Sequence, residues 1–420
     1  MIYKKINACR ICGNENLEPV LNLGMQALTG VFPHQNETVE SGPLELVRCV
    51  SNSEEKTCGL LQLAHNYSLE AMYGDNYGYR SGLNKSMVKH LESLVKKIED
   101  TVNIKNDDLI IDIGSNDCTL LKTYKNQNST LIGIDPTSNK FKEYYPEHIT
   151  NISDFFSADA IKDHTSKKAK VITSIAMFYD LENPIQFAKD IEETLDDDGI
   201  WVLEQSYMPM MIENISYDTV CHEHLEYYGV KQIKWIMDKS NLKIIDISTN
   251  GTNGASFCIT VAKKNSKHNE KSSLVTEFLN QEKSLGLDSL DVYENFAEKT
   301  EQHKNELVSQ IENLIKDKKT IFGYGASTKG NVILQYCNFT LEQIPYIAEV
   351  NPYKFGRKTP GSNIPIISEE EAKKLNPDYY LVLPWHFKEN IIERESEYLN
   401  SGGKLIFPLP KIEIISSDNS

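Results

Sequence analysis

The chain has 420 residues and a mass of 47.8 kDa. Single hydrophobic cores stop growing at roughly 250–300 residues, so we expect two or three domains. Its 44 Lys and Arg face 60 Asp and Glu, for a net charge of −16. This balance excludes a general nucleic-acid or membrane-surface binder, because phosphate backbones and anionic lipids attract clustered cations.

Neither a membrane span nor a secretion signal is predicted. No run of about 20 apolar residues is present that could form a transmembrane helix. The N-terminal sequence MIYKKINACRICGNEN also lacks the roughly 7–15-residue apolar stretch of a signal peptide. The sequence therefore predicts a cytoplasmic protein.

Four of the eight cysteines lie close to the N-terminus. Cys9 and Cys12 form a C-x2-C pair, and Cys49 and Cys58 form a wider C-x8-C pair. Disulfides are unusual in the cytoplasm, whereas four thiolates make a closed tetrahedral site for Zn²⁺ that leaves no position for a substrate. We therefore predict a structural zinc site within a module over residues 1–70. The alternative is four unrelated buried thiols.

A parallel α/β core is predicted next, over residues 71–264. It begins with a helix that has apolar residues on one face, namely Met87, Leu91, Leu94, Val95 and Ile98. Apolar strands then alternate with helical stretches, at residues 108–115, 131–136, 171–178 and 199–207, with a helix near 184–195. Residues 243–264 are typical of two strands joined by a Gly/Asn-rich turn, an antiparallel end to the sheet.

Two further parts follow this core. Residues 265–318 are polar and then charged and helical, so we predict a linker with connecting helices, whose charge runs form solvated faces. Apolar strands recur in residues 319–420, at 320–327, 346–352, 379–385 and 404–410, which predicts a second, smaller parallel α/β domain.

The motif IDIGSNDCTLL, residues 111–121, ends a buried strand and opens a helix. Gly114 lets the chain turn close to a ligand, but the G-x-G-x-x-G of a dinucleotide site is missing. The acids Asp112 and Asp117 would repel a pyrophosphate and would suit a sulfonium or an ammonium group. The motif therefore favours a cationic ligand over a nicotinamide dinucleotide.

Acids also follow the next two predicted strands. Asp135 is placed to bind the ribose hydroxyls of a nucleoside, and Asp159 is a candidate for the adenine amine. Acids at three successive strand ends predict an S-adenosylmethionine site, for which the candidate residues are Asp112, Gly114, Asn116, Asp117, Asp135, Asp159 and Ser81. The alternative is that these acids only cap helices.

A second motif, SYDTVCHEHLEYY, spans residues 216–228 and places a glutamate between two histidines. His222 and His224 would share a face on a strand but not on a helix, and the zinc-protease pattern H-E-x-x-H is absent. A histidine base needs a neighbour that sets its tautomer, and Glu223 could serve either one. We predict a catalytic cluster that includes Tyr217; a packed polar cluster is the alternative.

A third motif, GYGASTKGN at residues 323–331, lies at a predicted strand-to-helix turn. Its backbone amides and Lys329 could hold a phosphate. The segment NPYKFGRKTPG, residues 351–361, adds Lys354 and Arg357, which predicts a nucleotide-diphosphate pocket in an otherwise acidic chain. The candidate substrate-binding residues are Tyr77, Tyr179, Tyr324, Lys329, Lys354 and Arg357. The alternative is a solvated basic loop beside an ordinary tight turn.

Together these segments resemble the sugar C-methyltransferases, bacterial enzymes that methylate ring carbons of nucleotide-linked keto sugars. The resemblance runs over nearly the whole chain and is carried by CRICG, CGLLQL, YGYRSG, IDIGSND, CHEHLEYY, NGAS, GYGASTKGN, NPYKFGRKTPG and LPWHF. It implies an α/β protein of three parts: an N-terminal zinc-binding module, a class I methyltransferase core that uses S-adenosylmethionine, and a smaller Rossmann-like C-terminal domain that helps to hold the sugar nucleotide.

The resemblance also implies a mechanism. The second histidine of the motif, here His224, would act as the general base, and Glu223 would orient it or bind sugar hydroxyls. Proton removal beside a ketone gives an enolate, whose carbon attacks the methyl group in line. Methylation at C3 beside a C4 ketone is what the family favours, with zinc taking no part.

The chain departs from the family at two places near these residues. Cys221 occupies a position that is often tyrosine, so Tyr217, Tyr227 or His222 would have to stabilise the enolate oxygen in its place. Phe178 or Tyr179 stands where many members have histidine. The alternatives are therefore methylation of a hydroxyl or an amine, or a non-catalytic module that binds zinc and a sugar nucleotide.

Overall fold

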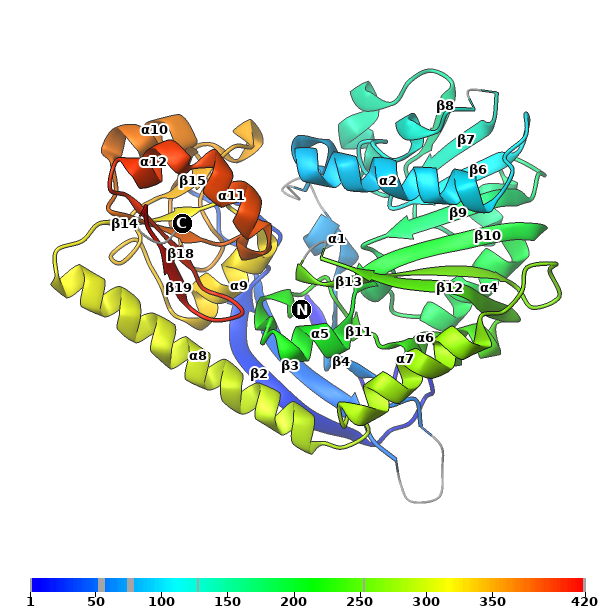
Figure 1. The fold of residues 1–420 in the computed structure, drawn as a ribbon, viewed down its shortest axis with the longest axis horizontal. Helices are drawn as coiled ribbons and strands as arrows, with labels where there is room; N and C mark the ends of the chain where they lie inside the picture. Colours follow the sequence, from blue (N-terminus) through cyan, green and yellow to red (C-terminus); the bar gives the residue numbers. More distant parts are fainter. Residues whose placement is uncertain (1, 52–56, 74–78, 127, 252–253, 418–420) are drawn as a thin grey trace.

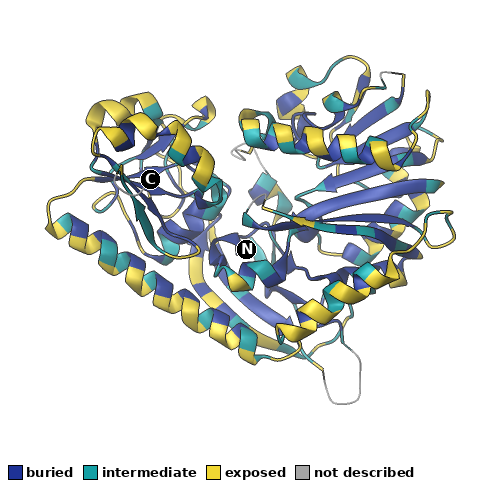
Figure 2. Ribbon diagram, viewed as in Figure 1, coloured by how far each residue is buried: buried dark blue, intermediate teal, exposed yellow. Residues whose placement is uncertain are grey.

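The computed structural model describes residues 2–51, 57–73, 79–126, 128–251 and 254–417. Figure 1 shows two α/β parts on either side of the molecule, with the strands of an N-terminal module crossing below and between them. Figure 2 shows that most strands in the two α/β parts are buried, whereas the outer helices and the long strand of the N-terminal module carry both buried and exposed residues. In the part of the chain that is described, no helix combines the length and hydrophobicity needed to cross a bilayer.

The N-terminal module is built from two small sheets. Strands β1 (Tyr3–Lys5) and β5 (His65–Tyr67) form an antiparallel pair. The larger sheet has the order β11-β4-β3-β2, with β2 (Leu17–Ala27), β3 (Ser41–Cys49), β4 (Leu61–Leu63) and β11 (Glu226–Tyr227). Strand β11 follows the predicted His-Glu-His motif directly. A distant segment of the chain therefore completes the sheet of this module.

The central part contains a seven-stranded sheet with the order β12-β13-β10-β9-β6-β7-β8. Its strands are β6 (Leu109–Ile113), β7 (Thr130–Ile134), β8 (Ile149–Ile152), β9 (Ala169–Ile175), β10 (Leu195–Ser206), β12 (Leu242–Asn250) and β13 (Ser256–Lys263). The pairs from β8 to β10 are parallel, and β13 and β12 add antiparallel strands at one end. This confirms the predicted parallel sheet with an antiparallel end.

Helices cover the central sheet, as its buried strands require. They include α2 (Lys85–Thr101), α3 (Ala158–Lys162), α4 (Pro184–Thr194) and α6 (Val230–Lys239). The short helices α1 (Leu69–Tyr73) and α5 (Met208–Glu213) pack instead in the core of the N- and C-terminal parts. Helix α2 begins where the Asn84 side chain accepts a hydrogen bond from the Ser86 amide. Its predicted apolar face is buried against the sheet, at Met87, Leu91, Leu94, Val95 and Ile98.

Two helices connect the central and C-terminal parts. Helix α7 (Ser272–Ser284) leads into α8 (Asp291–Lys316), which Figure 1 shows running from the N-terminal module to the C-terminal part. One face of α8 is buried, including Phe296, His303 and Leu307. The charged stretch is therefore amphipathic, and α8 packs against the rest of the protein along one side.

The C-terminal part contains a six-stranded sheet with the order β16-β15-β14-β17-β18-β19. Its strands are β14 (Ile321–Tyr324), β15 (Ile347–Glu349), β16 (Ile366–Ser368), β17 (Tyr379–Val382), β18 (Lys404–Phe407) and β19 (Glu413–Ile415), and only β19 is antiparallel. The accompanying helices are α9 (Thr328–Tyr336), α10 (Glu369–Leu375), α11 (Lys388–Arg394) and α12 (Ser396–Asn400).

Each large sheet contains a topological switch point, where successive connections lead to strands on opposite sides of one central strand. In the central sheet, β6 lies between β7 and β9; in the C-terminal sheet, β14 lies between β15 and β17. Ligands of open α/β sheets bind in the crevice outside the carboxyl ends of the strands at such points. The fold therefore offers two crevices.

Candidate active site and metal centre

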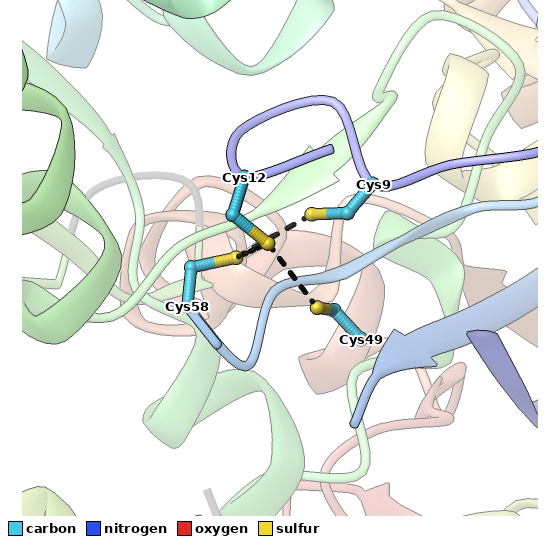
Figure 3. Close-up of side chains that lie close together, drawn as sticks. All are labelled: Cys9, Cys12, Cys49 and Cys58. Carbon is cyan, nitrogen blue, oxygen red and sulfur yellow. Dashed lines mark hydrogen bonds between the residues drawn. The ribbon is translucent and has the colours of Figure 1, made fainter. Parts of the chain in front are cut away.

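The four N-terminal cysteines come together in the structure, as Figure 3 shows. Their four sulfur atoms all lie within 4.8 Å of one another. Cys9 and Cys12 lie on a tight turn in which the Gly13 amide donates to the Cys9 carbonyl and Gly13 has a φ of +73°. Four thiols at this spacing fit one tetrahedral Zn²⁺ and leave no open coordination position, as a structural site requires.

A cavity of about 460 Å³ opens at the carboxyl ends of β6 and β7, on the crevice described above. Of the predicted cofactor residues, Ser81, Asp112, Gly114, Asn116 and Asp135 line it. Gly114 has a φ of +73°, and a β-carbon there would lie 3.2 Å from the Met177 side chain, so a glycine suits this turn. The first motif thus forms one wall of a cavity.

Asp135 shapes this wall as well as lining it. One carboxylate oxygen accepts from the Asn116 amide at 3.0 Å, and the other accepts from the Thr137 amide and hydroxyl, each at 2.6 Å. Asn116 in turn has a φ of +47°. The Asp135 carboxylate therefore fixes the turn after β6 in the conformation that faces the cavity.

Two predicted cofactor acids do not reach the cavity, which corrects their assignment. Asp117 turns the other way and accepts from the Arg80 guanidinium and the Gly82 amide, both at 3.0 Å. Asp159 lies in the first turn of α3 with its side chain 90% exposed and paired with Lys162. Since β8 already ends at Ile152, the acid that lines the cavity there is Asp154.

Further buried acids give the cavity a negative character. Burial raises the pKa of Asp112 to about 7, against an opposing hydrogen bond from Thr173. Burial and the nearby Glu223 raise the pKa of Asp180 well above its usual range, and one Asp180 oxygen has no hydrogen-bond partner. Such a cavity fits a ligand with positive charge, because a cation would offset the cost of burying these carboxylates.

His224 lies next to this cavity. Its Nδ1 is 2.8 Å from the Thr219 carbonyl oxygen, which can only accept, so Nδ1 carries the proton and Nε2 keeps its lone pair. Its ring packs on Tyr179 at 4.2 Å, and the next residue, Asp180, lines the cavity. Burial, with the charge of Lys329, lowers the pKa of His224 to about 3, so the imidazole is neutral at pH 7.

His222 points into the N-terminal module instead, which corrects its place in the predicted cluster. Its ring is fully buried, packs edge-on against Tyr67 at 4.8 Å and is 3.3 Å from the Gly42 carbonyl oxygen. Burial lowers its pKa to about 4. The segment is a tight turn and not the strand on which the two histidines would share a face: the His224 amide donates to the Cys221 carbonyl at 3.1 Å, and the two rings contact different parts of the protein.

Glu223 lies between the N-terminal module and the start of α9. A β-carbon on Gly30 would fall 1.9 Å from its carboxylate and 3.6 Å from the Thr328 hydroxyl. One carboxylate oxygen has no hydrogen-bond partner, and burial raises the pKa of the group. Glu223 is therefore not a hydrogen-bond partner of either His224 or His222.

Tyr217 and Tyr324 lie away from the site, contrary to their predicted roles. The Tyr217 hydroxyl is fully buried and 3.2 Å from Nδ1 of His303 on α8. The Tyr324 hydroxyl donates to Glu395 at 2.7 Å inside the C-terminal domain. Both tyrosines therefore stabilise packing. Tyr77 falls outside the described residues.

The predicted basic residues surround the second crevice but contact the protein itself. The Lys354 ammonium donates to the Ala326 carbonyl at 2.7 Å and lies over the Phe32 ring. Arg357 donates to the Phe32 carbonyl at 2.7 Å and to the Tyr353 carbonyl at 2.9 Å. The segment at 351–358 therefore docks the C-terminal domain on the N-terminal module, beside the Gly-rich turn.

Lys329 lies in the first turn of α9, which packs against residues 217–219 just before the His-Glu-His segment. Asp218 accepts from the Trp385 indole at 2.8 Å, and its charge acts on Lys329. Burial lowers the pKa of both His224 and His386, and the charge of Lys329 lowers each further. Lys329 and His224 therefore belong to one cluster, although 105 positions separate them in the sequence.

Sequence reasoning missed several of these residues. Glu204 lines the cavity at the end of β10 and is held by His90 at 2.5 Å and by Asn250 at 2.8 Å. Asp180 and Asp154 follow β9 and β8 in the same manner. Their common signal is a carboxylate within a few residues of a strand's carboxyl end.

Comparisons with known proteins divide the chain in a similar way. A family model described as "Putative zinc binding domain" matches residues 9–73, one described as "Methyltransferase domain" matches residues 83–247, and one described as "C-methyltransferase C-terminal domain" matches residues 251–410. The C-methyltransferase NovU of Streptomyces niveus is 27% identical over 424 aligned residues, covering 100% of this chain and 99% of that protein.

Solved structures show weaker similarity. Magnesium protoporphyrin IX methyltransferase of Synechocystis with bound S-adenosylmethionine is 11% identical, with a TM-score of 0.32, over 42% of this chain and 79% of that one. An S-adenosylmethionine-dependent methyltransferase of Clostridium acetobutylicum is 12% identical, with a TM-score of 0.32, over 42% of this chain and 92% of that one. We draw nothing further from similarities of this size.

Proposed function

We propose that this chain, which belongs to the S-adenosylmethionine-dependent C-methyltransferases and carries a zinc-binding module, methylates a ring carbon beside the ketone of a nucleotide-linked keto-deoxy sugar. The sugar substrate is supported by the resemblance of the whole chain to enzymes of that class. It is supported independently by the cations that surround the second crevice. Methylation at C3 beside a C4 ketone is the favoured position.

The observation that carries the proposal is the state and place of His224. Its Nδ1 proton is committed to the Thr219 carbonyl at 2.8 Å, so Nε2 is available as a base. Tyr179 contacts the imidazole, and the adjacent Asp180 lines the cofactor cavity. A carbon bound over His224 would therefore lie at the edge of the methyl donor's cavity, as transfer in line requires.

The cavity after β6 is proposed to hold the cofactor. Its acids would accept hydrogen bonds from the ribose and amino groups, with Asp135 and Asp154 at the strand ends and Asp180 closest to His224. When bound, S-adenosylmethionine supplies a methyl group on a sulfonium, and the methyl–sulfur electron pair stays on sulfur as the carbon–carbon bond forms. The protein's part is alignment and exclusion of water.

His224 would take the proton from the carbon beside the ketone, and the electron pair of that bond would move onto the carbonyl oxygen. Glu223, buried beside the start of α9 with one unpartnered oxygen, would bind sugar hydroxyls. Lys354 and Arg357, the cations beside the Gly-rich turn, would bind the diphosphate.

The test is mass spectrometry of keto-sugar nucleotides incubated with the protein and S-adenosylmethionine in deuterated water. A methyl group that remains on carbon after hydrolysis, with loss of one ring hydrogen, is the expected product. His224→Asn should lower turnover by more than about 10³-fold, because a general base contributes roughly 10²–10⁴-fold, while cofactor affinity measured by calorimetry stays unchanged.

His164→Asn is the matched control, because His164 is an exposed histidine at the end of α3, away from both crevices. A methyl group found on oxygen or nitrogen, with every ring hydrogen retained, would contradict C-methylation of the sugar. Full turnover by His224→Asn would remove His224 from the mechanism.

A further inference from the structure

An enolate needs a stabilising group on its oxygen close to the base, because the charge appears on the atom joined to the carbon that loses its proton. If the proposed function holds, a side chain near His224 must stabilise this oxygen. The residue before the motif is Cys221, whose thiol is fully buried and has a pKa raised well above its usual range, so it is a poor donor.

The nearby hydroxyls are already engaged. The Tyr227 hydroxyl lies 3.5 Å from the Thr219 carbonyl, and the Tyr73 hydroxyl donates to Asp180 at 3.1 Å. Tyr217 is turned toward His303 on α8. Each of these three hydroxyls therefore already has a partner in the protein.

Lys329 is the charged group that acts on His224 from the opposite domain. Its helix, α9, packs against residues 217–219, the turn that holds both Asp218 and the Thr219 carbonyl that fixes His224. Asn331, two residues further along α9, donates to the Thr29 carbonyl at 2.8 Å and holds the helix in place. The helix that carries Lys329 is thus held against residues 217–219 on one side and the N-terminal module on the other.

We propose that the Lys329 ammonium is a catalytic residue that stabilises the developing enolate oxygen while His224 removes the proton. The proton passes from the ring carbon to Nε2 of His224, and the carbonyl oxygen takes the negative charge opposite the Lys329 cation. When the carbon–carbon bond forms, the ketone returns and Lys329 loses its partner charge. No oxidant, metal or further reactant is required.

The surroundings of Lys329 suit this role better than diphosphate binding. If Lys329 bound the diphosphate, it would place that negative charge close to His224. The lysine would then be unavailable to the ketone oxygen. Burial lowers the pKa of Lys329, and the charge of Asp218 opposes that shift. Asp218 is fully buried, with one oxygen held by the Trp385 indole and the other without a partner. The proposal leaves Lys354 and Arg357, in the segment at 351–358, for the diphosphate.

The arrangement also explains how a weak base can work. Lys329 lowers the basicity of His224 when the site is empty. Its charge is offset once the enolate forms, so the same cation that weakens the base stabilises the product of deprotonation. A base this weak depends on strong stabilisation of the oxyanion.

The test compares Lys329→Met and Lys329→Gln with the wild type, using the keto-sugar nucleotide that the wild type methylates. We expect kcat to fall about 10²–10³-fold, as when one oxyanion-hole donor is removed, with KM for the sugar nucleotide changed less than threefold. Exchange of the ring hydrogen with deuterated water should fall by the same factor. The acidic limb of the kcat/KM profile should move to higher pH.

Lys329→Arg should recover part of the rate, because it keeps the charge. Lys374→Met is the matched control, since Lys374 is exposed on α10 and pairs only with Glu370 among the described contacts. Thermal unfolding of each variant separates lost folding from lost chemistry, and the glutamine variant keeps a polar tip if the methionine variant is unstable.

Three results would overturn the inference. The first is a raised KM with kcat retained, which indicates a phosphate-binding lysine. The others are an acidic limb of the kcat/KM profile at the wild-type pH, or exchange of the ring hydrogen at the wild-type rate in both neutral variants. Failure of the proposed function looks different, because the wild type itself would then transfer the methyl group without losing a ring hydrogen. That result also overturns the role of Lys329, since no enolate would form.

Discussion

The two large sheets offer the same kind of crevice but line it with different side chains. The crevice beside β6 is lined by carboxylates, including Asp112, Asp135 and Asp180. The crevice beside β14 presents Lys329 at the start of α9, with His386 close by. Both sheets have the switch point at which α/β folds bind ligands, and the side chains there differ: acids line the cavity beside β6, whereas Lys329 joins the acids Asp218 and Glu223 beside β14.

A second difference concerns what holds each crevice together. The acidic wall is braced by its own turn, through the hydrogen bonds of Asp135 to Asn116 and Thr137. The basic wall is braced by another domain, through Arg357 and the carbonyl of Phe32. The first crevice is therefore preformed within one domain, whereas the second depends on how the C-terminal domain docks.

The largest effect is expected from loss of the metal, which would remove the support of the second crevice. Cys58→Ser should abolish zinc binding and destabilise the N-terminal module, because a structural zinc contributes on the order of 10 kcal/mol to folding. Zinc content by elemental analysis and the melting temperature measure the effect. Cys337→Ser is the control, because Cys337 is also buried but lies at the end of α9. A Cys58→Ser variant that still bound one equivalent of zinc would contradict the four-cysteine site.

A smaller effect should follow from loosening the acidic wall. Asp135→Asn removes charge from an acceptor of three hydrogen bonds, which are worth roughly 1.5–3 kcal/mol each when charged, so we expect cofactor affinity to fall about 10–100-fold. Calorimetry measures it. Asp159→Asn, on the exposed face of α3, should bind as the wild type does. Equal affinities for the two variants would mean that Asp135 does not shape the site.

The smallest effect is a dependence of cofactor affinity on pH. Since burial raises the pKa of Asp112 to about 7, the Asp112 carboxyl is largely protonated below pH 7 in the absence of cofactor. A cationic cofactor favours the ionised carboxylate, so binding should release a proton and affinity should rise with pH, by at most about tenfold per unit, and level off above pH 7.

Calorimetry at pH 6, 7 and 8 in buffers of different ionisation enthalpy measures both the affinity and the proton released. Asp112→Asn should flatten the dependence, and S-adenosylhomocysteine, which lacks the sulfonium charge, should show less of it. Proton uptake on binding would show that Asp112 is not the titrating group.

Regular local patterns made most of the fold predictable from the sequence. The apolar run before Gly114 gave the first buried strand, and the acid after the next strand, Asp135, reached the cavity as expected. Asp159 did not, because the chain leaves β8 at Ile152 and the intervening residues already form the cavity edge. The sequence pattern predicts that a strand is present, but the residue at which the strand ends depends on tertiary packing.

The catalytic segment was harder to predict, because its side chains are distributed among different domains. His222 and His224 look equivalent in the sequence, and only the packing of His222 against Tyr67 separates them. Lys329 and Asp218 were brought together by docking of α9 on residues 217–219. Contacts across domain boundaries leave no periodic signal in a single sequence.

Strand β11 has a consequence for how this protein can be taken apart. Glu226 and Tyr227 pair with Gln62 and Leu61, so residues that follow His224 belong to the sheet of the N-terminal module. A fragment cut near residue 70 would leave that strand without its neighbour and His222 without its pocket. The segments matched by separate family models are thus not independent folding units, and exchanging modules between relatives would have to carry residues 217–228 along with the zinc site.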